Sequence, residues 1–162
     1  MKTFLLKREI WLPRPRAEVF AFLSEARNLQ TITPDWLKFE VLTPGALQMR
    51  VGLLIDYRIT VHGFPIRWRT EIAEWNPPDH FTDIQLRGPY SVWRHHHTFV
   101  ERDGGTLCGD EVLYRPKGGW LMDWLFVRRD LHRIFSYREQ RLVQMFGPSP
   151  AGSGISGSGT GS

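Results

Sequence analysis

Hydrophobic and polar residues alternate along much of this chain, and such alternation predicts β-strands. The clearest case is residues 88–116, where two alternating runs flank Asp103-Gly104. An Asp-Gly pair is a strong signal for a two-residue hairpin turn, because both central positions of a type I′ turn need a positive φ. With this pair at the tip, Arg102 lies opposite Gly105, and counting outward fixes the register of the hairpin.

That register places one series of side chains on a single face of the hairpin. The opposed pairs are Trp93 and Tyr114, His95 and Val112, His97 and Asp110, and Phe99 and Cys108. The other face carries residues that we expect to contact solvent, namely Arg94, His96, Thr98, Glu111 and Arg115. A face that only packs against a core should be uniformly apolar, but the first face is polar in its middle. It is therefore the main functional signal in the sequence.

The other elements follow from periodicity and from Pro and Gly breaks. A first strand over residues 3–12 ends at Pro13 and Pro15. We then expect a helix over Arg16–Ser24 and a short helix over Ala26–Thr31, stopped by Thr33-Pro34. Further strands are predicted at Leu37–Thr43, Leu53–His62, Ile66–Trp75 and His80–Arg87. The turns between them are Pro44-Gly45, Gly63-Phe64-Pro65, Asn76-Pro77-Pro78 and Gly88-Pro89.

A long amphipathic helix is predicted from Trp120 to Phe146, after the break at Gly118-Gly119. Its apolar stripe comprises Leu121, Trp124, Leu125, Leu131, Ile134, Phe135, Leu142 and Met145. Its arginines, which we expect on the solvated remainder, are Arg128, Arg129, Arg133, Arg138 and Arg141. Residues 147–162 are rich in Gly and Ser without periodicity. We therefore expect one domain over residues 1–146, followed by a disordered tail or an expression remnant.

The order of these elements predicts an α+β fold. All connections between strands are short, which favours an antiparallel sheet. A strongly curved sheet has a concave face, and the long helix is the predicted element whose apolar stripe is long enough to cover it. The space between sheet and helix is a natural position for a ligand cavity.

Composition favours a packed globular domain, with 41% hydrophobic and 13% aromatic residues. The net charge of +4 is modest and the basic residues are dispersed, so we expect a solvated surface and no nucleic-acid partner. Cys108 is the single cysteine, which excludes an internal disulfide. We expect it to be a small buried hydrophobic residue. Charged residues 7–9 interrupt the apolar N-terminus, and no run approaches the ~18 apolar residues of a membrane span. These features favour a cytoplasmic location.

Several segments together resemble one known superfamily. They are Ala26-Arg27-Asn28-Leu29, Thr33-Pro34-Asp35-Trp36, residues 66–72, Gly88-Pro89-Tyr90 with Trp93, His95, His97 and Phe99, and Asp110 with Tyr114, Pro116 and Gly118. Over residues 3 to about 146 the chain resembles the START-like (SRPBCC, Bet v 1-like) helix-grip superfamily. Within it, the chain is most similar to the polyketide cyclase/dehydrase or coenzyme Q-binding START-like group.

The resemblance implies a fold and a cavity, but not one activity. A helix-grip fold is a curved seven-stranded antiparallel sheet wrapped around a long C-terminal helix, with two short helices after the first strand. Members bind lipids, sterols, quinones or polyketides, and only some of them catalyse a reaction. The resemblance supplies no catalytic residue set for this chain.

We expect the inner face of the sheet to bind a small, mostly apolar molecule without turnover and without a cofactor. Asp83 and Gln85 share the face of Trp93 and His95 if the Gly88-Pro89 turn is four residues long. The polar candidates either orient a ligand or form a self-satisfied network that stabilises the sheet: Asp83, Gln85, His95, His97 and Asp110. The aromatic candidates form either a cavity wall or plain core: Trp68, Trp93, Phe99, Tyr114, Trp120 and Trp124.

Three alternatives involve individual residues of this set or the last helix. His97 and Asp110 form a candidate acid–base pair for a cyclase or dehydratase, although no nucleophile or oxyanion motif accompanies them. His95 and His97 with Asp110 form a candidate metal site, but no further ligand follows at a characteristic spacing, so we predict no metal. A transient contact with a membrane surface would use Arg128, Arg129 and Arg133.

Overall fold

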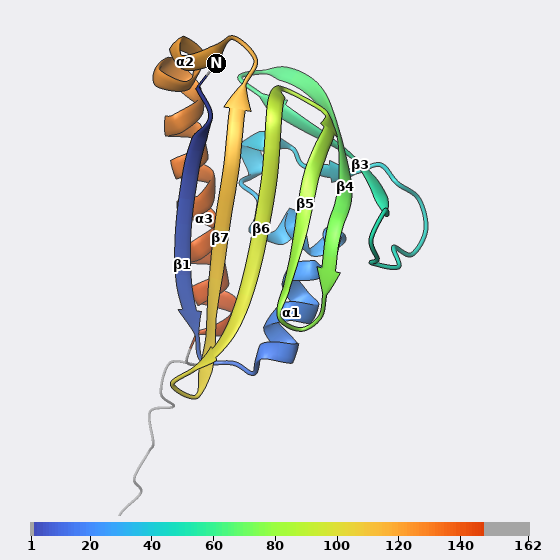
Figure 1. The fold of residues 1–162 in the computed structure, drawn as a ribbon, viewed down its shortest axis with the longest axis vertical. Coiled ribbons are helices and arrows are strands. Elements are labelled where there is room, and N and C mark those ends of the chain that lie inside the picture. Colours follow the sequence, from blue (N-terminus) through green and yellow to red (C-terminus); the bar gives the residue numbers. More distant parts are fainter. Residues whose placement is uncertain (1, 148–162) are drawn as a thin grey trace, which may run out of the picture.

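The computed structural model describes residues 2–147, within which seven strands form one antiparallel sheet of order β1-β7-β6-β5-β4-β3-β2 (Figure 1). The strands are β1 (Phe4–Leu12), β2 (Glu40–Val41), β3 (Leu54–Val61), β4 (Phe64–Asn76), β5 (His80–Arg87), β6 (Tyr90–Arg102) and β7 (Gly105–Pro116). The helical segments are α1 (Arg16–Ser24), η1 (Ala26–Ile32), η2 (Asp35–Leu37), α2 (Gly119–Met122), η3 (Asp123–Val127) and α3 (Arg128–Phe146). This arrangement confirms the predicted α+β helix-grip architecture. The predicted tail, from residue 148 onward, lies outside the described residues.

The β6–β7 hairpin has the register that the sequence predicts. Asp103 and Gly104 form its tip with φ values of 50° and 74°. Arg102 pairs with Gly105, His97 with Asp110, and the pairing continues to the far end of both strands. Because β1 pairs along the other edge of β7, this hairpin lies inside the sheet rather than at its margin.

A dense aromatic cluster fills one end of the space between sheet and α3, and we call it the packed end. Its buried residues are Leu12, Val19, Phe20, Leu23, Ile32, Phe81, Phe99, Cys108, Leu142 and Phe146. The Phe20 ring of α1 lies 5.1 Å from the Phe99 ring and 5.9 Å from the Phe81 ring, both in edge-on geometry. Helix α1 therefore fills this end, which also holds the hairpin tip and the C-terminal part of α3 (Figure 1).

Two local predictions are corrected by backbone conformation. The strand expected at Leu37–Thr43 shrinks to β2, because Lys38 adopts a left-handed φ of 44° and reverses the chain after η2. The turn expected at Gly63-Phe64-Pro65 lies one position earlier, since His62 and Gly63 both have positive φ. Two consecutive positive φ values make a two-residue hairpin turn, so β4 already begins at Phe64.

The apolar stripe predicted for the last helix is wrong in its first part. Trp124 is 69% exposed, and Leu121 and Leu125 are also exposed. The cause is η3, a turn of π-helix, because the extra residue in such a turn rotates everything before it relative to α3. The predicted stripe position Met145 is exposed as well.

The same helix also contains a residue that is more buried than predicted, Arg138. It was expected in solvent, but its side chain is buried on the inner stripe of α3 with Leu131, Phe135 and Leu142. These positions follow helical spacing, which places residue 138 inward whatever its polarity. Among the described residues, no helix combines the length and the hydrophobicity needed to cross a membrane.

Candidate functional site

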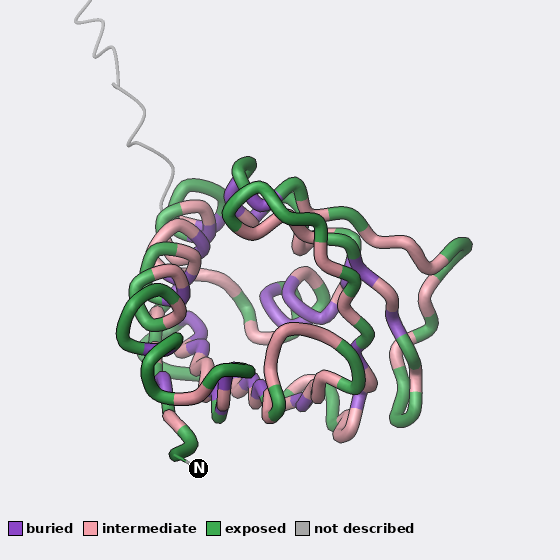
Figure 2. The backbone as a smooth tube through the Cα atoms, turned by 90° about the horizontal axis from the view of Figure 1, so that it is seen from above, coloured by how far each residue is buried: buried purple, intermediate pink, exposed green. Residues whose placement is uncertain are grey.

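A cavity of about 990 Å³ lies between the curved sheet and the C-terminal helical segments. Its wall is mainly apolar and includes Ile55, Ile59, Ile66, Trp68, Trp93 and Ile134. Viewed from above, the backbone forms a ring in which the strands face the C-terminal helix (Figure 2), and the residues that line the cavity come from both sides of this ring. The volume is at the upper end of the range of ~300–1,000 Å³ that is typical of small-molecule sites.

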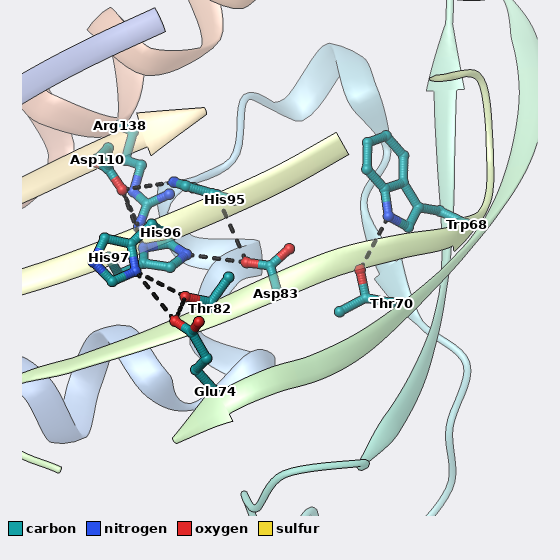
Figure 3. Close-up of polar contacts among 10 residues, drawn as sticks. All are labelled: Trp68, Thr70, Glu74, Thr82, Asp83, His95, His96, His97, Asp110 and Arg138. Carbon is teal, nitrogen blue, oxygen red and sulfur yellow. Dashed lines mark hydrogen bonds and ion pairs between the residues drawn. The ribbon is translucent and has the colours of Figure 1, made fainter. Parts of the chain in front are cut away.

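Five polar residues meet at the inner side of this cavity, and we call them the polar cluster: Asp83, His95, His97, Asp110 and Arg138 (Figure 3). Neighbouring strands bring them together, since Asp83 of β5 pairs with His95 of β6, and His97 pairs with Asp110 of β7. Arg138 reaches the same point from α3. The side chains of His95, His97 and Asp110 point toward the interior, as the sequence predicts.

The two imidazoles bridge the two carboxylates. His95 Nε2 lies 2.8 Å and His97 Nδ1 lies 3.1 Å from the same oxygen, Asp110 Oδ1. On the opposite side, His97 Nε2 lies 3.1 Å and His95 Nδ1 lies 3.7 Å from Asp83 Oδ2. The imidazole rings are adjacent, with centroids 3.7 Å apart. Asp110 Oδ1 is also 3.8 Å from Arg138 Nη2.

The surroundings of the two carboxylates keep both of them ionised. Burial acts to raise the pKa of the Asp110 carboxyl, but the Arg138 charge and the hydrogen bonds with His95 and His97 hold it well below its ordinary value. Burial acts in the same way on Asp83, whose pKa is lowered by its hydrogen bond with His97 and by the nearby positive charges. Both groups are therefore acceptors near neutral pH.

The two histidines have opposite shifts. Burial acts to lower the pKa of His97, but the hydrogen bonds with Asp110 and Asp83 raise it above its ordinary value. Burial and the neighbouring charge of His97 lower the pKa of His95. The raised pKa of His97 favours its protonated form, so His97 and Arg138 together offset the charge of the two carboxylates inside the protein.

The hydrogen bonds also assign the proton of neutral His95. Because an ionised carboxylate only accepts, we assign the proton to Nε2, which faces Asp110. Nδ1 then carries a lone pair at 3.7 Å from Asp83 Oδ2, beyond hydrogen-bond distance. His95 and His97 both line the cavity.

The structure divides the predicted site residues into three groups. Those in the cavity wall are Trp68, Asp83, Trp93, His95 and His97. Asp110 lies behind the imidazoles, which separate it from the cavity wall. The remaining predicted residues, Gln85, Phe99, Tyr114 and Trp124, lie elsewhere.

Each of these four has a physical reason for its position. The Gln85 amide donates to the Tyr90 carbonyl and accepts from the Tyr90 N–H, so it closes the β5–β6 turn. Phe99 belongs to the packed end. The Tyr114 hydroxyl donates to Asp123 Oδ1 at 2.8 Å, a carboxylate that is only 1% exposed. Trp124 is turned outward by the π-helical turn, as described above.

Arg138 is the member of the polar cluster that the sequence did not predict. Its charge lies within 3.8 Å of Asp110, and its guanidinium lies 5.9 Å from the Phe135 ring centroid. The helical spacing of Leu131, Phe135, Arg138 and Leu142 indicates an inward Arg138, whereas its residue type alone favours the solvated side.

A protein-family model described as polyketide cyclase / dehydrase and lipid transport matches residues 12–141. The chain belongs to this family. No curated protein sequence matches it. The family description includes both enzymes and lipid-transport proteins, so family membership is compatible with either function.

Solved structures share the fold of this family member at low sequence identity. A protein from Chromobacterium violaceum has a TM-score of 0.70 at 14% identity, covering 90% of this chain and 98% of the other. The Zhui aromatase/cyclase of a Streptomyces species has a TM-score of 0.69 at 12% identity, covering 89% and 93%. A major latex-like protein of Panax ginseng has a TM-score of 0.62 at 13% identity, covering 90% and 99%. These likenesses establish the helix-grip fold.

Proposed function

We propose that this protein binds a small, mostly apolar molecule, such as a lipid, a quinone or a polyketide, and carries it without chemical change. The observation that supports this most is the cavity of about 990 Å³, whose wall is apolar apart from a few converging polar groups. Burial of an apolar ligand there contributes ~25 cal/mol per Å² of surface removed from water.

The polar cluster would fix the orientation of such a ligand. Asp83 uses one carboxylate oxygen toward the imidazoles, and its other oxygen points away from them (Figure 3). A hydroxyl group of the ligand can donate to that oxygen. The Trp68 and Trp93 rings, perpendicular with centroids 5.1 Å apart, offer flat surfaces to a ring or an acyl chain.

A matched pair of variants on α3 tests this proposal with the neutral probe N-phenyl-1-naphthylamine. Ile134→Trp fills part of the cavity, because Ile134 lines it, whereas Val143→Trp enlarges an exposed position of the same helix. We expect Ile134→Trp to weaken probe binding at least about tenfold and Val143→Trp to leave it unchanged. Equal probe affinity in both variants would contradict binding in this cavity.

Native mass spectrometry of protein purified from cells would then identify the natural ligand class. A reproducible co-purified lipid or quinone that is absent from Ile134→Trp and retained by Val143→Trp would agree with carriage in the cavity. A molecule retained equally by both variants would place its binding outside the cavity.

A second candidate function is cyclisation or dehydration of a polyketide-like substrate. It is favoured by the contact of 3.1 Å between His97 and Asp110 in a family that includes cyclases. General acid–base assistance contributes ~10²–10⁴-fold to rate. If this function holds, His97→Ala abolishes turnover of a bound substrate and changes its affinity less than about tenfold. If His97→Ala loses both substrate affinity and the folded structure, the result would instead indicate that His97 has a structural role.

We further propose that the protein docks transiently on an anionic membrane through its exposed apolar end: Trp120, Leu121, Trp124, Leu125 and Phe126. Trp120 and Trp124 are 67% and 69% exposed, and tryptophan favours the membrane interface. Arg128 and Arg129 follow directly and are also exposed, which suits anionic headgroups. Met122 and Phe126 of the same segment line the cavity, so docking would bring the cavity close to the lipid.

A further inference from the structure

We propose that Asp83, His95 and His97 form a binding site for a divalent transition-metal ion at the inner side of the cavity. This proposal goes beyond the binding of an apolar molecule and does not depend on it. It rests on the directions of the ring nitrogens and on the position of Asp110.

The proposed ligand atoms converge on one point. Asp83, His95 and His97 each offer one ligand atom, and these atoms lie within 4.8 Å of one another. The ring nitrogens on the side of Asp83 are His95 Nδ1 and His97 Nε2. The two nitrogens lie 3.7 and 3.1 Å from Asp83 Oδ2. Ligands bound ~2.1 Å from a tetrahedral ion lie roughly 3.4 Å apart, so only small shifts would accommodate the ion.

Asp110 has the position of an outer carboxylate that orients metal-binding imidazoles. Its Oδ1 is hydrogen-bonded to His95 Nε2 at 2.8 Å and lies 3.1 Å from His97 Nδ1, the other nitrogen of the second ring. Protons on those two nitrogens leave His95 Nδ1 and His97 Nε2 as the metal-binding atoms, both directed toward Asp83. Such outer partners are usual for histidine ligands and raise their basicity. Arg138 balances the charge of Asp110 from 3.8 Å.

The structure therefore reverses the roles that the sequence suggested. The register of the hairpin alone made Asp110 the third ligand, whereas the β5–β6 register puts Asp83 opposite His95. Asp83, His95 and His97 line the cavity, while Asp110 lies behind the imidazoles. The free coordination positions of a bound ion would thus face the cavity, where water or a ligand oxygen can occupy them.

The donor set defines the class of ion. Two imidazoles and one carboxylate suit Zn²⁺, Fe²⁺ and Co²⁺ rather than Ca²⁺ or Mg²⁺, which prefer oxygen ligands. A bound ion would lie between His97 Nε2 and Asp83 Oδ2, which are 3.1 Å apart, and both imidazoles would bind it in their neutral form.

Titration of the full chain with Co²⁺, followed by visible absorption, tests the proposal directly. We expect imidazole-ligated Co²⁺ bands that saturate at one ion per chain and disappear when Zn²⁺ is added. Wild-type protein that leaves the spectrum of aqueous Co²⁺ unchanged would overturn the proposal, and this readout needs no variant to fold.

Variants then assign the ligands, with folding checked by far-UV circular dichroism. We expect Asp83→Asn and His97→Ala each to weaken Co²⁺ binding more than tenfold, and Asp110→Asn to weaken it about 10–100-fold. His96→Ala is the matched control, because His96 faces the opposite side of the sheet and contacts Thr82 at 2.7 Å. The His96 ring also lies 5.4 Å from that of His80, which makes this pair the competing surface site.

Loss of the Co²⁺ bands in His96→Ala, with retention in His97→Ala, would also overturn the proposal. Titration with N-phenyl-1-naphthylamine in metal-free buffer separates this outcome from the proposed function. If the protein binds the probe but not Co²⁺, the metal-site proposal is wrong and the proposal of a ligand cavity still holds.

Discussion

The two ends of α3 face very different interiors. At its C-terminal end, Leu142 and Phe146 belong to the packed end, where the Phe22 and Phe146 rings lie 5.0 Å apart. Nearer its start, Ile134 faces the cavity of about 990 Å³. The same helix and the same sheet therefore form a dense core at one end and an open space at the other.

The difference lies in what stands between helix and sheet. At the packed end α1 inserts Phe20, whose ring contacts those of Trp75, Phe81 and Phe99. The strands β3 and β4 extend beyond this plug, and their inner residues Ile59 and Ile66 line the cavity instead. The polar cluster lies between the two regions, since the His97 ring stacks on Phe81 at 4.1 Å while His97 also lines the cavity. Buried polar groups are thus placed where a dense core ends.

The largest expected effect comes from breaking the polar cluster. Asp110→Ala leaves the His97 and Arg138 charges without their shared partner, so we expect a loss of about 3–5 kcal/mol in the free energy of unfolding. Urea unfolding measures this loss. The neighbour Glu111, ion-paired with Lys7 on the outer surface, is the control, and Glu111→Ala should leave the free energy of unfolding nearly unchanged. Equal costs for both variants would mean that the cluster adds little to stability.

The next largest effect compares the two ends of α3 directly. Leu142→Ala removes a buried side chain from the packed end and should cost about 2–5 kcal/mol. Ile134→Ala should lower the free energy of unfolding by less than about 1.5 kcal/mol. The Ile134 side chain already borders the cavity, so its removal opens no new void. Both values follow from urea unfolding. A cost for Ile134→Ala as large as that for Leu142→Ala would show that the cavity wall is packed as tightly as the core.

A smaller effect is expected at the exposed apolar end. Replacing Trp120 and Trp124 together by Ala should change the free energy of unfolding by about 0.5 kcal/mol or less, since both are exposed. The same double variant should reduce binding to phosphatidylglycerol-containing vesicles by about tenfold or more, measured by co-sedimentation. Val100→Ala in β6 near the tip of the β6–β7 hairpin, also exposed, is a control at the opposite end of the molecule (Figure 1). Unchanged vesicle binding in the double variant would rule out docking through these residues.

The smallest effect concerns Cys108 in the packed end. Burial raises the pKa of its thiol to about 12, so almost no thiolate exists near neutral pH. We expect negligible reaction with a thiol-specific disulfide reagent in the native protein and rapid reaction in urea. Fast labelling of native protein would show that the packed end opens locally.

The sequence determined the fold, and part of the candidate site, by local rules. Alternation, turn residues and helical spacing are properties of neighbouring residues, so α1, β5 and the complete β6–β7 register could be predicted within a residue or two. The hairpin register alone also put His97 opposite Asp110 on an inward face. For the aromatic candidates, local rules predict an inward position but do not distinguish a residue of the core from a residue of the cavity wall.

Only the tertiary structure decided which inward residues meet. Asp83 joined the histidines through the β5–β6 pairing, and Arg138 through the docking of α3, both contacts between elements distant in sequence. The π-helical turn rotated Trp124 out of the interior, although its spacing had predicted the opposite. Local periodicity fixes the direction of a side chain relative to its own element. What that side chain then touches depends on how curved sheet, plug and helix pack together, which is a property of the whole chain.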